Sequence, residues 1–398
     1  MFKKILLSAI LLFDLNNFAL AKEKISLDEL LKLGLENNLK IKSFKNKKDI
    51  YLSQIIIANS VNNPVFNTDI SPPQRTYRFG VNQEIEIYSK RQLRIDEAKK
   101  NKELYELELN KLINEIKFQI KSKFNDIAYL EIKANKYNKL IETFKNLINI
   151  SNKREKVGDI PKIDINQLEL IYLNLLNERE DILSRLNQEK INISEFIGIS
   201  IYDKDFNYEN YLKFKSIPKI YLADIYQKNV EIFYFNKLKE YFFTQKLKVE
   251  SENIPNFTLG SGLDIVTENQ QANFGTFINL NVPIPIFYKK EGEIKELEAK
   301  IFQLDFEIDN LKQVIKIKID SFLEKINFLK KQINLYENEI LPKSMELVKK
   351  SNKAFEAGKY GIVNSILFYQ NYIQNELKYI DIIYEYKKKH YQFRKRGL

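Results

Sequence analysis

The sequence contains no cysteine and no tryptophan, and its 398 residues include only one histidine and two methionines. Without cysteine there can be no disulfide, no thiolate metal site and no thiol nucleophile. A Gly-x-Ser-x-Gly elbow and a glycine-rich phosphate loop are also missing. The single histidine, His390, has no companion ligands and is interpreted as a surface residue. The sequence therefore predicts no enzyme, no metal site and no cofactor.

Glycine and proline are scarce, with 11 and 9 residues, and they cluster between long runs that lack both. The longest of these runs covers residues 89–156, where Leu, Ile, Phe and Tyr recur at steps of three and four. This spacing puts the apolar side chains on one stripe of an α-helix. At roughly 1.5 Å per residue the helix is about 100 Å long. It is expected to end at Val157-Gly158, where a second amphipathic run turns back.

The formal charge of +11 does not by itself indicate nucleic-acid binding. Lysines alternate with glutamates along the helical runs, which is typical of solvated helix faces. Residues 1–21 have the features of a secretory signal peptide: Lys3-Lys4, an apolar core and Ala19-Leu20-Ala21. A lipobox cysteine is missing, which argues against an N-terminal lipid anchor. Beyond this segment no apolar run reaches about 18 residues, so no helical membrane span is expected.

The remaining chain divides into two repeats, 22–215 and 216–398. Ile25–Phe44 aligns without a gap on Ser216–Phe235, about 191 residues later, and the pair Val157-Gly158 matches Ala357-Gly358 about 200 residues later. The difference between these two offsets is expected to come from a longer loop in the second hairpin, Thr267–Asn273. The first repeat is predicted to contain a helix at 25–60, a β-hairpin at 64–87, the long helix 89–156, a helix at 162–196 and an irregular connector. The second contains a helix at 218–253, a hairpin at 255–287, a long helix at 291–356 with a kink at Pro342, and a helix at 362–390.

Both predicted hairpins alternate between apolar and polar side chains. Alternation of this kind predicts a sheet with one apolar and one polar face. Four strands with exposed edges are unstable in water and in lipid alike, and closure into a barrel removes the edges. Three chains would supply twelve strands, within the range of outer-membrane barrels. The polar face would then line a water-filled lumen, with Arg78, Glu84, Glu86 and Asp264.

The helices alone are also compatible with a coiled-coil rod or dimeric stalk of the cell envelope, although that interpretation leaves both hairpins without a role. The predicted fold class is therefore mainly α with a small β part: an internally duplicated, long-helix α-barrel joined to a trimeric, 12-stranded transmembrane β-barrel.

The chain resembles the TolC-like outer-membrane efflux protein family over essentially the whole mature chain, and four sequence segments carry the resemblance. The most specific is Tyr336–Leu377, with its Glu-Ile-Leu-Pro turn and a following glycine-containing tip. Asn281–Tyr288 with Gly292 and Ala299 is similar to the family's strand-to-helix junction, and Asn82–Tyr88 is its counterpart in the first repeat. Ser26–Asn38 is similar to the N-terminal segment of the family.

The resemblance implies a homotrimer with a β-barrel in outer-membrane lipid and an α-barrel across the periplasm. It also implies a periplasmic adaptor and an inner-membrane transporter as partners, and no nucleic acid. The adaptor would dock at the helix tips, Val157, Gly158, Ala357 and Gly358. The periplasmic entrance would be formed by Asp164, Asn364 and Leu367, although some members carry aspartates at the positions of the last two. The function implied is a passive exit duct of an efflux pump. The alternative of a type I polypeptide secretion channel stays open, as does the substrate: drug, metal cation or polypeptide.

Overall fold

The computed structural model describes residues 24–72, 76–208, 211, 221–268, 271–357 and 362–394. It shows a mainly helical chain with a small β part. The predicted signal peptide 1–21 and the tip residue Gly358 lie outside the described residues. The chain divides into two compact units. The helical unit comprises residues 1–39, 114–218 and 321–395, and the sheet unit comprises 40–113, 219–320 and the last three residues.

The helical unit is built from long helices and one short parallel strand pair. Its elements are β1 (Lys24–Ile25), α2 (Leu27–Asn37), the second part of α5 (Lys90–Glu155), α6 (Lys162–Ile197), β4 (Asp205–Phe206), the last part of α9 (Glu291–Leu335), η2 (Tyr336–Ile340), α10 (Leu341–Glu356) and α11 (Ile362–Arg394). The connector expected to be irregular pairs β4 with β1. Ser26 caps α2 in a complete capping box with Glu29.

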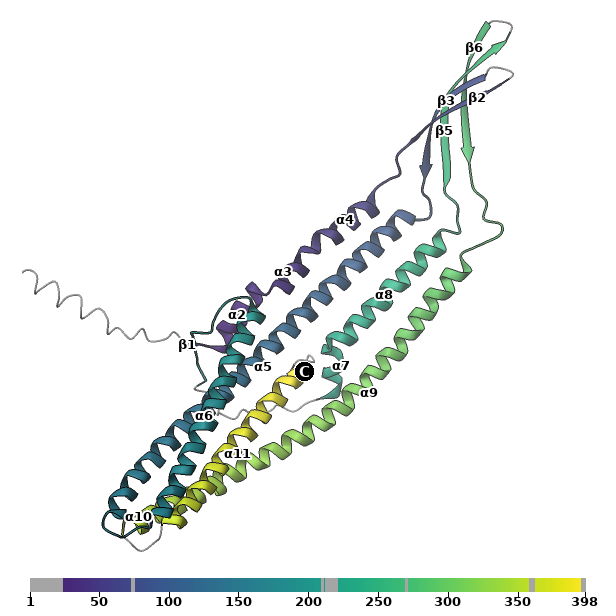
Figure 1. The fold of residues 1–398 in the computed structure, drawn as a ribbon. Coiled ribbons are helices and arrows are strands. Elements are labelled where there is room, and N and C mark those ends of the chain that lie inside the picture. Colours follow the sequence, from purple (N-terminus) through teal and green to yellow (C-terminus); the bar gives the residue numbers. More distant parts are fainter. Residues whose placement is uncertain are drawn as a thin grey trace, which may run out of the picture. The chain divides into compact units, whose positions relative to one another are not determined.

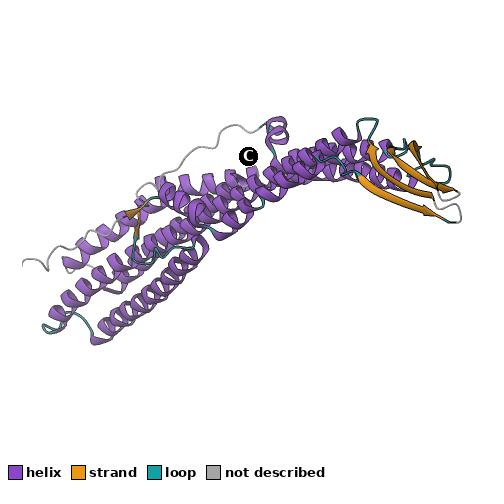
Figure 2. Ribbon diagram, turned by 90° about the horizontal axis from the view of Figure 1, so that it is seen from above, coloured by secondary structure: helices purple, strands orange, loops and turns teal. Residues whose placement is uncertain are grey.

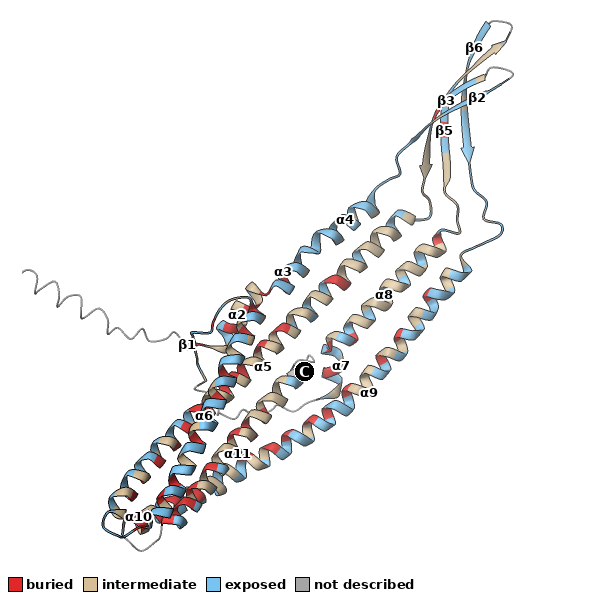
Figure 3. Ribbon diagram, viewed as in Figure 1, coloured by how far each residue is buried: buried red, intermediate tan, exposed pale blue. Residues whose placement is uncertain are grey.

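A continuous apolar core joins α5, α6, α10 and α11 in the helical unit (Figure 3). Phe144 is fully buried there and makes an edge contact with Tyr369, with ring centroids 5.9 Å apart. The buried residues of α6, such as Leu168, Leu175 and Ile182, recur at steps of three, four or seven and so form one apolar stripe on this helix. This stripe is therefore the inner face of the helical unit.

The sheet unit holds the four main strands and the helices that lead to them (Figures 1 and 2). Its helices are α3 (Leu39–Asn46), α4 (Lys48–Asn59), the first part of α5, α7 (Leu222–Lys228), α8 (Val230–Ser251) and the first part of α9. Its strands are β2 (Val65–Ser71), β3 (Thr76–Ile85), β5 (Phe257–Glu268) and β6 (Gln271–Asn281). They form one antiparallel sheet in the order β2-β3-β5-β6.

Two helices predicted to be continuous are broken, so those predictions were wrong. The segment 25–60 is interrupted at Asn38 and Lys47, and the segment 218–253 is interrupted at Asn229. Asn38 and Asn229, which the repeat alignment matches, both have extended ψ angles (118° and 117°) and are buried. The side-chain oxygen of Asn229 accepts hydrogen bonds from the backbone N–H groups of Glu231 and Ile232. Asparagine competes with the helix for backbone hydrogen bonds, so it starts a new helix instead of continuing the old one.

The second hairpin has longer strands, not the longer loop that was expected. Thr267 and Asn273 belong to the paired region, because Val266 pairs with Asn273 and Thr267 with Ala272. The return strand ends at Asn281, so the apolar residues that follow, as far as Phe287, lie outside the sheet. The segment from Val282 to Tyr288 is a connection between β6 and α9.

Pro342 is accommodated by a π-helical turn. Residues Tyr336–Ile340 form this turn, and the N–H of Leu341 donates to the carbonyl oxygen of Tyr336. Pro342 then lies in the first turn of α10, where its missing N–H costs little. The matching helix α5 runs for 66 residues without interruption. None of the helices in the described part of the chain is long and apolar enough to cross a membrane.

Candidate functional site

The first helix tip is held by Arg154 at the end of α5. Its Nε donates to Asp159 (2.7 Å), and its Nη1 donates to the carbonyl oxygen of Phe355, near the end of α10 (2.7 Å). The guanidinium also stacks on the Phe355 ring, 4.4 Å from its centroid. The Arg154 side chain therefore orders the turn that follows α5 and connects it to the end of α10. The sequence offered no signal for this role, because Arg154 is one of many charged residues on its helix.

The predicted docking residues lie around this joint. Gly158 has φ +77°, and among the residues that the structure describes no atom lies within 4 Å of the position a Cβ would take. Val157 is 78% exposed, and Ala357 is exposed as well. Gly158 is therefore required by the backbone conformation, since most side chains avoid positive φ. The tip presents Val157 to the surroundings, while the neighbouring Ile160 is buried.

Arg154→Lys is expected to loosen the two tips without disrupting the helical unit. A lysine can donate to only one region at a time and cannot stack its charge flat on Phe355. We expect a local loss of about 1.5 kcal/mol, the cost of one charged hydrogen bond. Hydrogen exchange of the Val157–Ile160 amides should be faster, while Lys153→Ala, one residue away and exposed, should leave exchange unchanged. Equal exchange in Arg154→Lys and the original protein would contradict the joint.

The three predicted entrance residues lie near the starts of the two helices that follow the tips, with Leu367 in the second turn of α11. Asp164 is half-buried in the first turn of α6. Asn364 and Leu367 are exposed and share one side of α11, three residues apart. Their side chains add no hydrogen bond to the tip joint among the described contacts. Their role at an entrance stays a prediction.

The polar face of the sheet is set by strand register. Arg78 of β3 lies directly opposite Asp264 of β5 and opposite Asp69 of β2. Residues directly opposite each other point to the same side of a sheet. Arg78 and Asp264, predicted from sequence, are thus neighbours on one face, and Asp69 is a third charge that sequence reasoning missed. Its signal was available, since Asp69 alternates with the apolar Ile70.

Glycines on this polar face provide room for larger side chains to lie across the strands. Phe277 of β6 covers Gly80 and Gly262, where an added Cβ would come within 2.8 Å and 2.9 Å of its ring. Arg78 lies over the same ring, 5.9 Å from its centroid. The carboxylate of Asp264 covers Gly275 in the same way, and the amides of Asn82 and Asn279 both cover Gly260. Phe277 had not been expected on the polar face.

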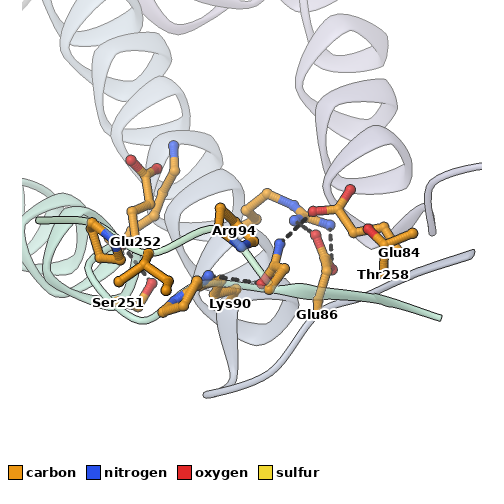
Figure 4. A pocket seen from close by; sticks show the side chains of 13 residues that line it. Glu84, Glu86, Lys90, Arg94, Ser251, Glu252 and Thr258 are labelled. Carbon is orange, nitrogen blue, oxygen red and sulfur yellow. Dashed lines mark hydrogen bonds and ion pairs between the residues drawn. The ribbon is translucent and has the colours of Figure 1, made fainter. Parts of the chain in front are cut away.

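At the base of the sheet a pocket of about 460 Å³ is lined by charged side chains of both signs (Figure 4). Glu86 lies just beyond β3 and pairs with Arg94 of α5. Glu84 accepts hydrogen bonds from the side-chain amides of Asn62 and Asn256, both at 2.7 Å. Burial lowers the pKa of Lys90, although the charge of Glu252 acts in the opposite direction. These charged groups are held by ion pairs and hydrogen bonds within the chain. The pocket lies where the strands of the sheet meet the helices. Glu84 and Glu86 are therefore brought together, away from Arg78 and Asp264.

Comparison with solved structures gives the same fold repeatedly. The chain superposes on the outer membrane protein VceC from Vibrio cholerae with a TM-score of 0.72 at 11% identity, covering 93% of this chain and 96% of that one. For the open-state MtrE outer membrane channel of Neisseria gonorrhoeae the TM-score is 0.70 at 10% identity, with 93% and 88% covered. For the Campylobacter jejuni CmeC outer membrane channel it is 0.68 at 13% identity, with 93% and 85% covered. The chain has a TolC-like fold.

The solved structures support the TolC-like fold, whereas the two sequence comparisons add nothing to it. No family model matches the chain, and no curated protein sequence matches it either. Identities of 10–13% show the fold alone, so the activity and the partners of this chain are a separate question. The sheet and the helix tips are the parts of the fold from which the activity and the partners can be argued.

Proposed function

We propose that three copies of this chain form a passive exit duct across the outer membrane. The observation that carries the proposal is the four-stranded antiparallel sheet, which ends in β2 on one side and β6 on the other. An unpaired strand edge cannot be stable in hydrocarbon, because its N–H and C=O groups have no partner there. Closing three sheets edge to edge gives a 12-stranded barrel with no open edge.

The two faces of the sheet support this arrangement. The side opposite Arg78 carries large apolar residues that are exposed in the single chain: Phe66, Ile70, Tyr77, Phe79, Val81, Leu259, Leu263, Phe274, Ile278 and Leu280. Ile278 is 81% exposed. A surface of this kind fits lipid, while the face of Asp69, Arg78 and Asp264 fits a water-filled lumen.

The helices, like the sheet, carry apolar residues that are exposed in the single chain. Examples in the sheet unit are Ile56 and Ile57 on α4 and Phe302 and Phe306 on α9. In the helical unit, Leu170 and Leu173 on α6 are likewise exposed. We infer that neighbouring copies cover these residues and form an α-barrel in the periplasm. A periplasmic adaptor would dock at Val157 and Gly158 and at the second tip, and an inner-membrane transporter would supply the substrate. That substrate could be a drug, a metal cation or a polypeptide, because the transporter makes the selection.

The proposal is tested by introducing single cysteines, since the chain has none of its own. Asn279 and Ile278 are neighbours in β6 that point to opposite faces. In intact cells a charged, membrane-impermeant thiol reagent should label Asn279→Cys at least about tenfold faster than Ile278→Cys, because only the first faces water. The same two proteins should cross-link as trimers.

A structural coiled-coil protein of the envelope gives a different result. Both cysteines would then be labelled equally once the reagent reaches the periplasm, and the purified protein would be a water-soluble dimer. That outcome would overturn the duct.

A further inference from the structure

The segment that connects β6 to α9 is apolar and largely exposed. Its sequence is Val-Pro-Ile-Pro-Ile-Phe-Tyr, from Val282 to Tyr288. Ile284 is 76% exposed, Ile286 is 68% exposed and Phe287 is 99% exposed. All three lie in the sheet unit, immediately after the last paired residue of β6. An exposed apolar run of this kind needs a partner surface.

The first repeat has a corresponding stretch that carries charges, which begins in the last residues of β3 (Glu84 and Ile85) and continues into the connection to α5. Asn82 aligns with Asn281, so Glu84 and Glu86 fall on Pro283 and Pro285, while Ile85 and Ile87 fall on Ile284 and Ile286. Both connections end in non-glycine residues with positive φ, Tyr88 and Ser89 in the first and Lys290 in the second. The second repeat thus has prolines where the first has glutamates, and both have isoleucines at the alternate positions.

The two glutamates of the first stretch bond within the chain, whereas the last apolar residues of the second connection are exposed. Glu86 pairs with Arg94, and Glu84 accepts from Asn62 and Asn256. Pro283, Ile284 and Pro285 also border that charged pocket, so one side of the segment is seated on it. Ile286 and Phe287 are not among the lining residues and are exposed.

The two prolines favour a lipid surface over water. Proline has no N–H, and it keeps the preceding residue extended, so the backbone of this segment has fewer donors to satisfy. Immediately afterwards the chain becomes strongly polar at Lys289, Lys290 and Glu291. The hydroxyl of Tyr288 bonds to Glu293 and accepts from the N–H of Gly292 (3.2 Å). A tyrosine with an apolar body and a bonded hydroxyl, followed by lysines, is typical of a membrane–water boundary.

We propose that Ile284, Ile286 and Phe287 insert into the periplasmic leaflet of the outer membrane and contact phospholipid there. The inference rests on the proposed function, because it places the base of the sheet at the membrane. It adds a second contact with lipid, made by an irregular segment at the boundary of the leaflet and not by a strand. The row of lipid-facing residues of β6, which includes Ile278 and Leu280, continues into this segment.

The absence of tryptophan makes a direct test possible. Phe287→Trp gives a single fluorophore at the proposed contact, Ile278→Trp reports the sheet, and Tyr202→Trp reports an exposed site in the helical unit. Each trimer is reconstituted into phosphatidylcholine vesicles that carry bromine at a shallow or a deep acyl position. We expect shallow bromines to reduce the fluorescence of Phe287→Trp by about twofold, deep bromines to affect it less, and Tyr202→Trp to be unaffected.

The three reporters distinguish failure of this inference from failure of the duct. If Ile278→Trp is quenched and Phe287→Trp is not, the segment does not contact lipid. Blue emission from Phe287→Trp would then assign the segment to a second copy of the chain, and red emission would assign it to water. If Ile278→Trp is not quenched by either lipid, the membrane-spanning sheet itself is overturned, whatever Phe287→Trp shows.

Discussion

Gly262→Ala is expected to reduce the amount of assembled trimer by about tenfold, because overpacking by a single methyl group costs about 1–3 kcal/mol in each chain. A Cβ on Gly262 would collide with the carbonyl oxygen of Phe79 and lie 2.6 Å from the Cα of Gly80. Both are backbone atoms of β3, the strand that joins the two hairpins. They cannot move aside without opening the β3–β5 pairing. Trimer yield in the outer membrane, measured on native gels, is the readout.

The chain contains a matched control for this substitution. Gly80 lies directly opposite Gly262, but the closest atom to a Cβ there would be the outer edge of the Phe277 ring at 2.8 Å, and the nearest backbone atom, the carbonyl oxygen of Ser261, would be 3.2 Å away. A ring edge can turn away, so Gly80→Ala should reduce trimer yield by less than about twofold. Ser261→Ala, next to Gly262 but on the opposite face, should have no effect. Equal yields for Gly262→Ala and Gly80→Ala would show that the backbones tolerate the methyl group.

Gly158→Val is expected to abolish most export while the trimer still forms. The residue has φ +77°, where an L side chain costs about 1–2 kcal/mol and a β-branched one more, so the native turn becomes about tenfold rarer. No atom of the described part of the chain crowds the position, so the expected cost is one of backbone conformation. Gly158→Asn is the matched variant, because asparagine tolerates this conformation. Export of a dye or peptide by cells that carry the complete pump is the measurement.

The two variants distinguish two roles of Gly158 in adaptor docking: its backbone conformation and its lack of a side chain. If Gly158→Asn exports normally and Gly158→Val does not, the turn conformation is what the adaptor recognises. If both variants lose export with normal trimer yield, the adaptor needs the bare surface of glycine itself. Normal export in Gly158→Val would remove the tip from the docking surface.

The sequence predicted the long helices and strands well because each is a periodic pattern. The stripe over 89–156 corresponds to α5 at Lys90–Glu155, within one residue at each end. Helix breaks were missed because they depend on single residues whose effect is tertiary. Lys47 separates α3 from α4 where the hydroxyl of Tyr105, 58 residues away in sequence, bonds to the carbonyl oxygens of Phe44 and Lys45 (3.0 and 3.2 Å). A local reading of the chain contains no information about that contact.

In the candidate site, too, the periodic patterns were predictable and the long-range contacts were not. Alternation identified Arg78 and Asp264 as residues of one face, and register then placed them opposite each other. The joint made by Arg154 and Phe355 could not be predicted, because it links residues about 200 positions apart whose partners are set by packing. Phe277 was missed for a related reason. An aromatic residue on a polar face is explained only by the glycines on neighbouring strands that receive it.

In the proposed 12-stranded barrel, those glycines would also affect the width of the passage. Side chains that project inward from a strand occupy the bore, and twelve strands leave limited space for them. Here Phe277, Asp264, Asn82 and Asn279 lie along the wall, over Gly80, Gly262, Gly275 and Gly260. The open diameter of the proposed barrel would then be set by the backbone more than by the side chains. Such a bore would admit bulky cargo while still presenting charge and aromatic surface to it.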